Sequence, residues 1–331
     1  MGTMVERERA GSMGAESGGI GCVVIAGPTA SGKTALAADA AEAFGGTVIN
    51  ADSMQIYRGL AVLTDQPGPA ATSRAPHRLF GVLDAAEPCS AGRWREMALA
   101  EIRAAHGAGT TPFVVGGTGL YLRALMRGLA RIPPVPDAVR RTLLARAAAA
   151  PDGALHAELR RRDPEAALRI PPGDPQRTLR ALEVLEATGR PLSEWQRAAA
   201  PETNEGLRFL TILLMPPREA LYAAIGARFA AMMERGALEE VAALRARGLD
   251  PALPAMKALG VPELSRHLDG EIAREAALSA ARQATRRYAK RQITWFRHQI
   301  VADFVLESQY SERTGPEIFS KVSTFLLTSP G

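Results

Sequence analysis

Short apolar runs alternate with stretches of helical pattern along much of the chain. Four runs are almost continuously apolar, which is typical of strands buried on both faces of a parallel sheet. They cover residues 22–26, 47–50, 113–115 and 209–215. Ala-rich segments over residues 33–44 and 93–106 predict helices beside them, and Gly45 and Gly46 end the first of these helices. Strands that alternate with helices predict an α/β protein with a doubly wound parallel sheet.

The pattern changes in the middle of the chain. Residues 120–200 carry no strand signal and consist of Ala-, Arg- and Leu-rich helical segments interrupted by prolines, which we interpret as a helical insertion at the rim of the sheet. After residue 215 the pattern is helical again, with a long basic helix over residues 271–299. The expected organisation is a disordered leader (1–19), an α/β core (20–120 and 205–308), the helical insertion (121–204) and a polar tail (309–331).

The composition is that of an ordinary soluble globular protein. Forty Lys and Arg against thirty-five Asp and Glu leave a formal charge of +5, and this mild excess is compatible with an RNA partner without requiring one. The N-terminal segment lacks the apolar centre of a signal peptide, and no apolar run approaches the roughly 18 residues of a membrane span. The two cysteines, Cys22 and Cys89, form no CxxC pair or Cys/His array, which gives no support to a zinc module or a disulfide framework. We expect a cytoplasmic monomer with no membrane partner.

A phosphate-binding loop lies between the first predicted strand and the first predicted helix. Its sequence, GPTASGKT, fits the pattern GxxxxGK[ST]. Glycines let backbone amides face an anion, and the helix N-terminus adds a partial positive charge. Lys33 supplies a cation to the phosphate oxygens, and Thr34 is the expected protein ligand of a Mg²⁺ ion. The predicted phosphate-binding residues are Gly27, Pro28, Thr29, Ala30, Ser31, Gly32, Lys33 and Thr34.

The loop alone does not identify the reaction. An ATP-using kinase or ATPase usually places a metal-binding acid at the end of a neighbouring strand. Here the third predicted strand ends in Gly116, Gly117 and Thr118, with no carboxylate at its tip, and the acid follows the second strand instead, at Asp52. This departure counts against a small-molecule kinase and directs attention to Asp52 and Thr118.

Five blocks of sequence together resemble the tRNA dimethylallyltransferases, also called tRNA isopentenyltransferases. They are GPTASGKT (27–34), NADSMQIYRG (50–59), GGTGLY (116–121), DPQRTLRALE (174–183) and YAKRQITWFR (288–297). Their order and spacing match the family over residues 20–299. Eukaryotic members commonly carry a C-terminal zinc finger, and because this chain has no Cys/His array, we expect the bacterial form.

The resemblance implies a fold, a reaction and a cofactor. The fold is a phosphate-loop α/β core, like that of the P-loop NTPases, with a helical insertion. Enzymes of this family transfer the dimethylallyl group of dimethylallyl diphosphate to N6 of the adenosine just 3′ of the anticodon in tRNA, and release diphosphate. The phosphate loop is therefore expected to bind the diphosphate leaving group, with Mg²⁺ as the only cofactor, and the partners are dimethylallyl diphosphate and the anticodon stem-loop of tRNA.

Asp52 and Thr118 are the predicted catalytic residues. The exocyclic amine of adenine is a weak nucleophile, and a carboxylate within hydrogen-bond reach can accept its proton as the new bond forms. We expect Asp52 to be that base; the alternative is that it orients Thr34 or a metal-bound water. Thr118 resembles the family threonine that faces the reaction centre and is expected to bind a bridging oxygen of the diphosphate, although it also suits the N-cap of the next helix.

A larger set of residues is expected to contact tRNA. The target adenine lies in a single-stranded loop, where it can be splayed out and recognised by its edges. Gln176 and Arg180 are four residues apart and share one face of a predicted helix, with Arg177 adjacent. The predicted tRNA-binding residues are Asp52, Ser53, Met54, Gln55, Thr118, Arg140, Gln176, Arg177, Thr178, Leu179 and Arg180.

Two departures from the family pattern affect the expected charge of the site. The family usually has Thr-Ala-Lys-Pro where this chain has TDQP (64–67), so a basic side chain is missing. The family block Gly-Tyr-Arg appears here as GVP (260–262), and in relatives that arginine is associated with the diphosphate. Either Lys257 or an arginine of the last long helix replaces it, or the site works with one cation fewer.

Two further functions stay open at this point. An isopentenyltransferase that acts on free adenine nucleotides would share the phosphate loop, but it would not need the block around Gln176, Arg177 and Arg180. A non-catalytic RNA-binding protein that has lost its activity is supported only by the missing arginine.

Overall fold

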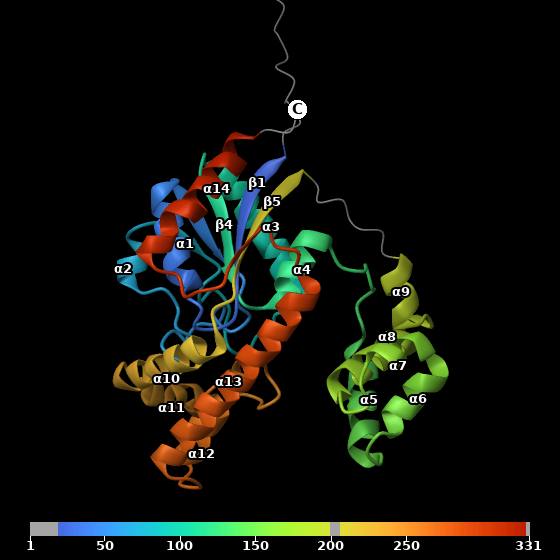
Figure 1. Ribbon diagram of the computed structural model, residues 1–331. Helices are drawn as coiled ribbons and strands as arrows, with labels where there is room; N and C mark the ends of the chain where they lie inside the picture. The colour runs from blue at the N-terminus through green and yellow to red at the C-terminus, as the bar shows by residue number, and fades with distance from the viewer. Residues whose placement is uncertain (1–18, 199–205, 329–331) are drawn as a thin grey trace, which may run out of the picture. The chain divides into compact units, whose positions relative to one another are not determined.

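The computed structural model describes residues 19–198 and 206–328, and the chain divides into two compact units (Figure 1). The first unit takes Met1–Leu122 and Glu205–Gly331, and the second takes Arg123–Asn204. The division falls close to the boundaries expected for the insertion. The predicted disordered leader lies outside the described residues except for Gly19.

The first unit is built on a six-stranded, wholly parallel sheet in the order β3-β2-β4-β1-β5-β6. The strands are β1 (Ile20–Ala26), β2 (Gly46–Asn50), β3 (His77–Arg78), β4 (Thr111–Gly116), β5 (Leu207–Leu214) and β6 (Phe304–Leu306). The four predicted strands correspond to β1, β2, β4 and β5, which confirms the α/β fold class. The two edge strands were not predicted, because two or three residues carry no detectable periodicity.

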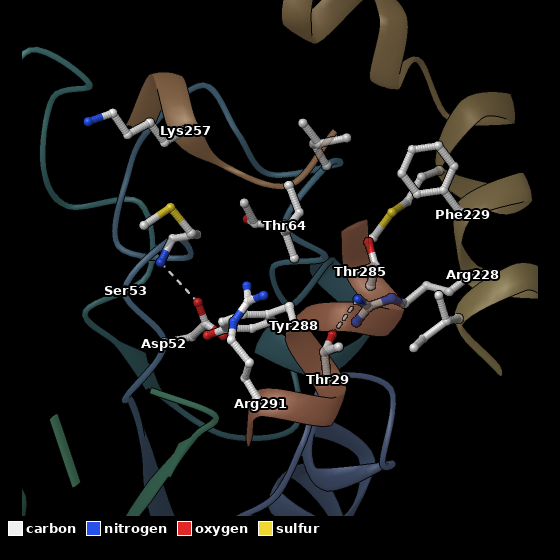
Figure 2. A pocket seen from close by; sticks show the side chains of 15 residues that line it. Thr29, Asp52, Ser53, Thr64, Arg228, Phe229, Lys257, Thr285, Tyr288 and Arg291 are labelled. Atoms are coloured by element: carbon white, nitrogen blue, oxygen red, sulfur yellow. Dashed lines mark hydrogen bonds between the residues drawn. The ribbon is translucent and has the colours of Figure 1, made fainter. Parts of the chain in front are cut away.

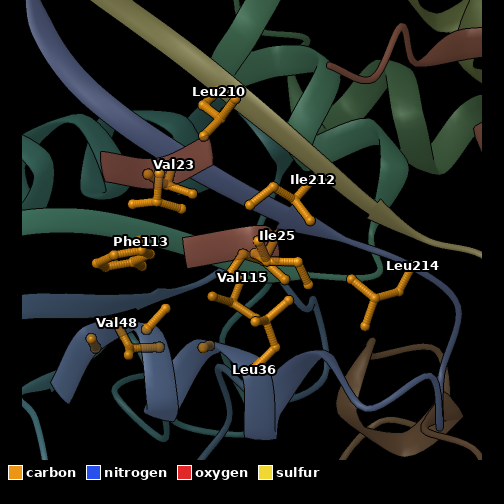
Figure 3. Packing of buried hydrophobic residues seen from close by; sticks show 14 of the residues in the cluster. Val23, Ile25, Leu36, Val48, Phe113, Val115, Leu210, Ile212 and Leu214 are labelled. Carbon is orange, nitrogen blue, oxygen red and sulfur yellow. The ribbon is translucent and has the colours of Figure 1, made fainter. Parts of the chain in front are cut away.

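Helices cover both faces of this sheet, which explains why its central strands are apolar throughout. On one face, α1 (Lys33–Ala43) and α14 (Gly315–Leu327) pack on side chains from the four central strands (Figure 3). The segment expected as a polar tail therefore contains a packed helix, with Ile318 and Val322 fully buried. On the other face lies α3 (Ala91–Gly107), which contacts β1, β2 and β4.

A buried tryptophan of α3 fixes the end of β2. Trp94 is fully buried, stacks on Tyr121 with a centroid distance of 4.5 Å, and donates its indole N–H to the carbonyl of Asn50 at 2.8 Å. Asn50 is the last residue of β2, so this hydrogen bond helps to position the loop that begins at Ala51 and carries Asp52.

A group of helices follows β5 in the first unit (Figure 1). They are α10 (Arg218–Glu234), α11 (Ala237–Ala246), the 3₁₀ turn η1 (Ala255–Lys257), α12 (Val261–Leu268) and α13 (Arg274–Gln299). α13, the predicted long basic helix, packs against α10 and α12. Two short elements complete this unit, α2 (Pro69–Thr72) and the 3₁₀ turn η2 (Glu312–Thr314). Among the described residues, no helix combines the length and the apolar character that crossing a membrane requires.

The second unit contains helices and no strand among its described residues. α4 (Gly119–Arg127) runs into this unit from the first, and α5 (Asp137–Ala149), α6 (Ala154–Arg162), α7 (Pro164–Arg169), α8 (Pro175–Thr188) and α9 (Leu192–Ala198) follow. Its core forms around Leu143, Leu159 and Leu182. The buried carboxylate of Asp163 accepts hydrogen bonds from the amides of Ala166 and Ser193, both at 3.0 Å, which joins the start of α7 to α9.

Candidate active site

The phosphate loop connects β1 to α1 as predicted, and its backbone is held in the conformation that anion binding needs. Gly32 (φ 90°) and Ala30 (φ 63°) are both left-handed, and no side chain caps the N-terminus of α1. The first amides of the helix are therefore free to receive an anion. A Cβ on Gly27 would lie 2.8 Å from the carbonyl oxygen of Leu214 in β5, so only glycine fits where the loop leaves the sheet.

Lys33 lies partly buried within this loop, and its Nζ donates to the carbonyl of Pro28 at 3.1 Å. Burial lowers the pKa of the Lys33 ammonium to about 8; Asp52 opposes this shift, and the positive charge of Arg228 adds to it. An ammonium that is poorly solvated gains more from an incoming anion than one in water does. The structure thus places a poorly solvated ammonium in the loop before α1.

Asp52 and Thr118 occupy the loops after β2 and β4, which are neighbouring strands. The Thr118 hydroxyl accepts a hydrogen bond from the amide of Ser53 at 2.9 Å and lies 3.2 Å from the Ser53 hydroxyl. The Thr118 amide donates to the carbonyl of Ala51 at 3.2 Å. The hydroxyl of Thr118 is thus joined to the loop that carries Asp52, and no hydrogen bond from it to its own helix occurs among the described residues.

The Asp52 loop is further held by its own side chains. One carboxylate oxygen of Asp52 accepts from the amide of Met54 at 2.9 Å. The buried side chain of Asn50 accepts from the Asp52 amide at 2.8 Å and donates to the Asp52 carbonyl at 3.0 Å. The amide group of Gln55 donates to the carbonyls of Thr64 and Asp65, both at 2.9 Å. Asp52 therefore projects from a preorganised loop.

A cavity of about 260 Å³ opens beside Asp52 and the phosphate loop (Figure 2). Its apolar wall combines side chains from the β2–α2 region, α10 and the segment after η1: Met54, Leu63, Ile225, Phe229, Met232 and Leu259. Its polar wall includes Thr29, Asp52, Arg228, Lys257 and Arg291. A cavity with an apolar half and a cationic half suits a ligand that is an apolar group bonded to an anion.

Arg228 of α10 is the main candidate site residue that the sequence analysis did not predict. Its guanidinium donates to the hydroxyl of Thr29 in the phosphate loop at 2.5 Å and lies 3.7 Å from the Asp65 carboxylate. Burial lowers the pKa of Arg228, and Asp65 and Asp52 oppose the shift. Arginine stays charged throughout the physiological range. No motif surrounds Arg228; only the packing of α10 brings it to the loop.

The two departures from the family pattern can now be placed. Pro262 is exposed at the start of α12 and does not line the cavity, whereas Lys257, Arg228 and Arg291 do. Lys257 and an arginine of the last long helix were the predicted replacements, and Arg228 is a third. Asp65 has a left-handed backbone (φ 57°) and pairs with Arg228 and, at 3.0 Å, with Arg235. Asp65, which departs from the family pattern, thus helps to hold the guanidinium of Arg228 in place.

Two residues of α13 near the loops that follow β2 and β4 were also not predicted. Tyr288 lines the cavity; burial, reinforced by the charge of Asp52, raises the pKa of its phenol, so the hydroxyl stays protonated and can donate a hydrogen bond. Gln292 is buried between the phosphate loop and the turn before Thr118. Both belong to the block YAKRQITWFR, but helical periodicity alone cannot tell a core-facing polar residue from a site residue.

The predicted tRNA-binding residues of the second unit lie at and near the start of α8. Gln176, Arg177 and Arg180 are exposed; Arg177 pairs with Asp174 at 3.3 Å and Arg180 with Glu183 at 3.5 Å. Arg140 of α5 is exposed and lies 3.9 Å from the same Glu183. Arg140 and Arg180 therefore both lie beside the carboxylate of Glu183.

Thr178 and Leu179 differ from their neighbours. Thr178 is buried and its hydroxyl donates to the carbonyl of Asp174 at 2.9 Å, while Leu179 packs against the core of the second unit. In the structure their side chains stabilise the start of α8. Their contact with tRNA stays a prediction.

A metal ion would have few protein ligands in this site. Among residues 19–198 and 206–328, no group of three or more His, Cys, Asp or Glu side chains could hold a metal ion. Thr34 is exposed in the first turn of α1. One hydroxyl beside a phosphate loop fits Mg²⁺, which keeps several waters and takes further oxygens from a bound phosphate.

Comparisons with known proteins show similarity over most of the chain. The family model described as IPP transferase matches residues 55–299, and the model described as isopentenyl transferase matches residues 20–79. The chain is 61% identical to the tRNA dimethylallyltransferase of Rhodospirillum centenum over 280 residues, which is 85% of this chain and 89% of the relative. It is 55% identical to the tRNA dimethylallyltransferase of Rhodopseudomonas palustris over 84% of this chain and 87% of the relative.

Solved structures are similar over almost the whole chain. The tRNA isopentenylpyrophosphate transferase of Bacillus halodurans is 32% identical, with a TM-score of 0.67 over 92% of this chain and 96% of its own. A eukaryotic dimethylallyltransferase acting on tRNA is 26% identical, with a TM-score of 0.81 over 94% of this chain and 80% of its own. With the matching family model and these relatives, the chain belongs to the IPP transferase family, the family of the tRNA dimethylallyltransferases.

Proposed function

We propose that this protein transfers the dimethylallyl group of dimethylallyl diphosphate to N6 of the adenosine just 3′ of the anticodon in tRNA, releasing diphosphate. The observation that carries the proposal is a single cavity bordered by the phosphate loop, by Asp52 and by an apolar wall. A ligand with an anionic end and a short apolar end suits the phosphate loop and the apolar wall, and Asp52 is left to accept a proton from the second substrate. We further propose that the protein acts in the cytoplasm, where tRNA is found, and that it acts as a monomer.

The diphosphate end is assigned to the phosphate loop. The free amides at the start of α1, Lys33 and Arg228 supply positive charge at that end of the cavity. As the carbon–oxygen bond of the substrate breaks, negative charge grows on the departing diphosphate, and fixed cations and amides stabilise it without reorganisation. Mg²⁺ bound to Thr34 would add Lewis-acid stabilisation of the same oxygens.

The dimethylallyl end is assigned to the apolar wall formed by Met54, Leu63, Phe229 and their neighbours. Burial of this group is favourable by roughly 25 cal/mol per Å² of apolar surface removed from water. The same wall keeps water from the reacting carbon, which would otherwise be hydrolysed.

Asp52 is assigned as the general base. One of its carboxylate oxygens is held by the Met54 amide, which leaves the other available to N6 of the adenine. In the transfer, the N6–carbon bond forms, the carbon–oxygen bond breaks with its electron pair leaving on diphosphate, and the N6 proton passes to Asp52. Thr118, fixed to Ser53, is assigned to a bridging oxygen of the diphosphate.

Recognition of tRNA is assigned to both units. Ser53, Met54 and Gln55 continue the Asp52 loop and would meet the edges of bases in the anticodon loop. In the second unit, the exposed Gln176, Arg177, Arg180 and Arg140 would contact flanking bases and phosphates. An enzyme for free adenine nucleotides would not need these residues, and the IPP transferase match spans the insertion that carries them.

A competition experiment tests the proposal. Labelled dimethylallyl diphosphate and Mg²⁺ are offered with an anticodon stem-loop that has adenosine 3′ of its anticodon, in the presence of AMP. Label on the stem-loop and none on AMP supports the proposal. Label on AMP alone would establish the free-nucleotide activity instead, and label on neither would show that the protein lacks transferase activity.

A further inference from the structure

The side chain of Gln292 joins the two turns that flank the site. It projects from α13, is 5% exposed, and lies between the phosphate loop and the turn after β4. Its carbonyl oxygen accepts from the backbone amide of Thr29 at 2.9 Å. Its amide nitrogen donates to the backbone carbonyl of Gly117 at 2.8 Å. Both ends of the side chain are therefore used on backbone atoms far apart in sequence.

The geometry around this bridge leaves little freedom. A Cβ on Gly117 would lie 2.4 Å from the Gln292 amide nitrogen, so the absence of a side chain there permits the contact. The orientation of the amide is determined, because an N–H must meet an oxygen and a carbonyl must meet an N–H. The neighbouring α13 residues Ala289 and Phe296 are fully buried, which holds the helix in register.

We infer that Gln292 is a positioning residue that sets the distance between the diphosphate site and the reacting centre. Thr29 belongs to the phosphate loop and receives the Arg228 hydrogen bond, while Gly117 directly precedes Thr118, which is joined to the Asp52 loop. The inference rests on the proposed function. A misplacement of about 1 Å between a leaving group and its catalytic groups costs on the order of 100-fold in rate.

The donor–acceptor pattern yields a specific chemical test. An ionised carboxylate in place of the amide offers only acceptors, so it would repel the Gly117 carbonyl. A protonated carboxyl again has one acceptor and one donor and can restore both hydrogen bonds. Burial raises the pKa of such a carboxyl, so Gln292→Glu should recover as the pH falls. Gln292→Met is similar in length, has neither group and cannot recover.

The experiment compares kcat and KM for dimethylallyl diphosphate in the wild-type protein, Gln292→Glu and Gln292→Met at a series of pH values. Gln283, exposed on the same helix with no side-chain hydrogen bond among the described contacts, supplies matched controls as Gln283→Glu and Gln283→Met. We expect kcat of Gln292→Met to fall about 10- to 100-fold, with a smaller change in KM. The kcat of each variant is divided by the kcat of the wild type at the same pH. This ratio should rise about tenfold or more from mildly alkaline to mildly acidic buffer for Gln292→Glu, and for no other variant.

A second readout needs no catalysis. Hydrogen exchange at the Thr29 amide should be faster in Gln292→Met than in the wild type, and in Gln292→Glu its protection should return on acidification. This readout separates the inference from the proposed function, since a wild-type protein without transferase activity would still show it. The inference would be overturned if Gln292→Met kept the kcat of the wild type. It would also be overturned if the ratio of kcat between Gln292→Glu and the wild type did not change with pH and the exchange rate of the Thr29 amide stayed the same in the variants.

Discussion

Arg228 of α10 donates a hydrogen bond to the hydroxyl of Thr29 in the phosphate loop, over 2.5 Å between Nη2 and Oγ1. The two residues are 199 positions apart in sequence. The other terminal nitrogen of the guanidinium, Nη1, lies 3.7 Å from the carboxylate of Asp65, which belongs to the segment after β2. A cation held by a carboxylate and a phosphate loop is oriented before the substrate arrives. We therefore propose Arg228 as a substitute for the family arginine that is missing at Pro262.

Replacing Arg228 should therefore weaken binding of the diphosphate. Hydrogen bonds to charged groups contribute about 1.5–3 kcal/mol, so Arg228→Met should raise KM for dimethylallyl diphosphate about 10- to 100-fold. Arg235→Met is the matched control, since Arg235 also pairs with Asp65 but does not line the cavity. Steady-state kinetics gives KM for dimethylallyl diphosphate in both variants. An equal rise in KM with the two substitutions would mean that Arg228 acts only through its ion pair with Asp65.

The affinity for dimethylallyl diphosphate should fall as the pH rises through about 8, the pKa of Lys33 in the free protein. Below that pH the ammonium is charged and attracts the anion; above it the neutral amine does not, so the dissociation constant should increase, by at most about tenfold per pH unit. The substrate phosphates are already ionised, because their last pKa is about 6.

Calorimetric titration at several pH values measures this dependence. Lys33→Arg, which stays charged over the whole range, is the control and should show a flatter profile. A wild-type affinity that does not change between neutral and alkaline pH would contradict the assigned role of Lys33.

Arg177 and Arg180 should contribute to tRNA affinity and to its salt dependence. Each phosphate contact that is lost should lower the slope of log K against log salt concentration by roughly one unit. We expect Arg177→Ala and Arg180→Ala to weaken stem-loop binding and flatten this slope. Arg169→Ala, in the same unit and paired with Glu165, should leave both unchanged. If log K fell with log salt concentration at the same slope in all three variants, Arg177 and Arg180 would not contact tRNA phosphates.

Gly116, the last residue of β4, should tolerate no side chain. A Cβ there would lie 2.2 Å from the carbonyl carbon and oxygen of Ala51, which are backbone atoms next to Asp52. Overpacking of this kind costs typically 1–3 kcal/mol or more, so Gly116→Ala should lower the free energy of unfolding by at least that amount. Gly107, at the end of α3, has open space around its Cβ position; Gly107→Ala should be neutral or slightly stabilising in the same denaturant titration.

The fold and the phosphate loop could be predicted from the sequence because both depend on local pattern. Continuous apolar runs revealed β1, β2, β4 and β5, and the motif GPTASGKT lies where a strand meets a helix. The helix α14 was missed because its apolar residues follow a polar, proline-containing segment.

The rest of the site depends on contacts between distant segments, which a single sequence does not encode as pattern. Arg228 and Asp65 each look like ordinary surface charges until α10 packs beside the phosphate loop. Gln292 lay within a recognised block, but its two backbone partners are 263 and 175 positions away. Lys257 and the arginines of α13 were predicted from their charge alone to replace the missing family arginine. In the structure, Lys257 and Arg291 line the cavity.

The most direct test of the account is the product made by Asp52→Asn. Asparagine keeps the size of the side chain but cannot accept the N6 proton. Nucleosides from a stem-loop incubated with dimethylallyl diphosphate and Mg²⁺ are analysed by mass spectrometry, and binding of the diphosphate substrate is measured in parallel. We predict N6-dimethylallyladenosine 3′ of the anticodon with the wild type, and a loss of about 100-fold or more in turnover with Asp52→Asn while the diphosphate still binds. Near-normal turnover by Asp52→Asn would contradict the mechanism, and no modified adenosine from the wild type would contradict the function itself.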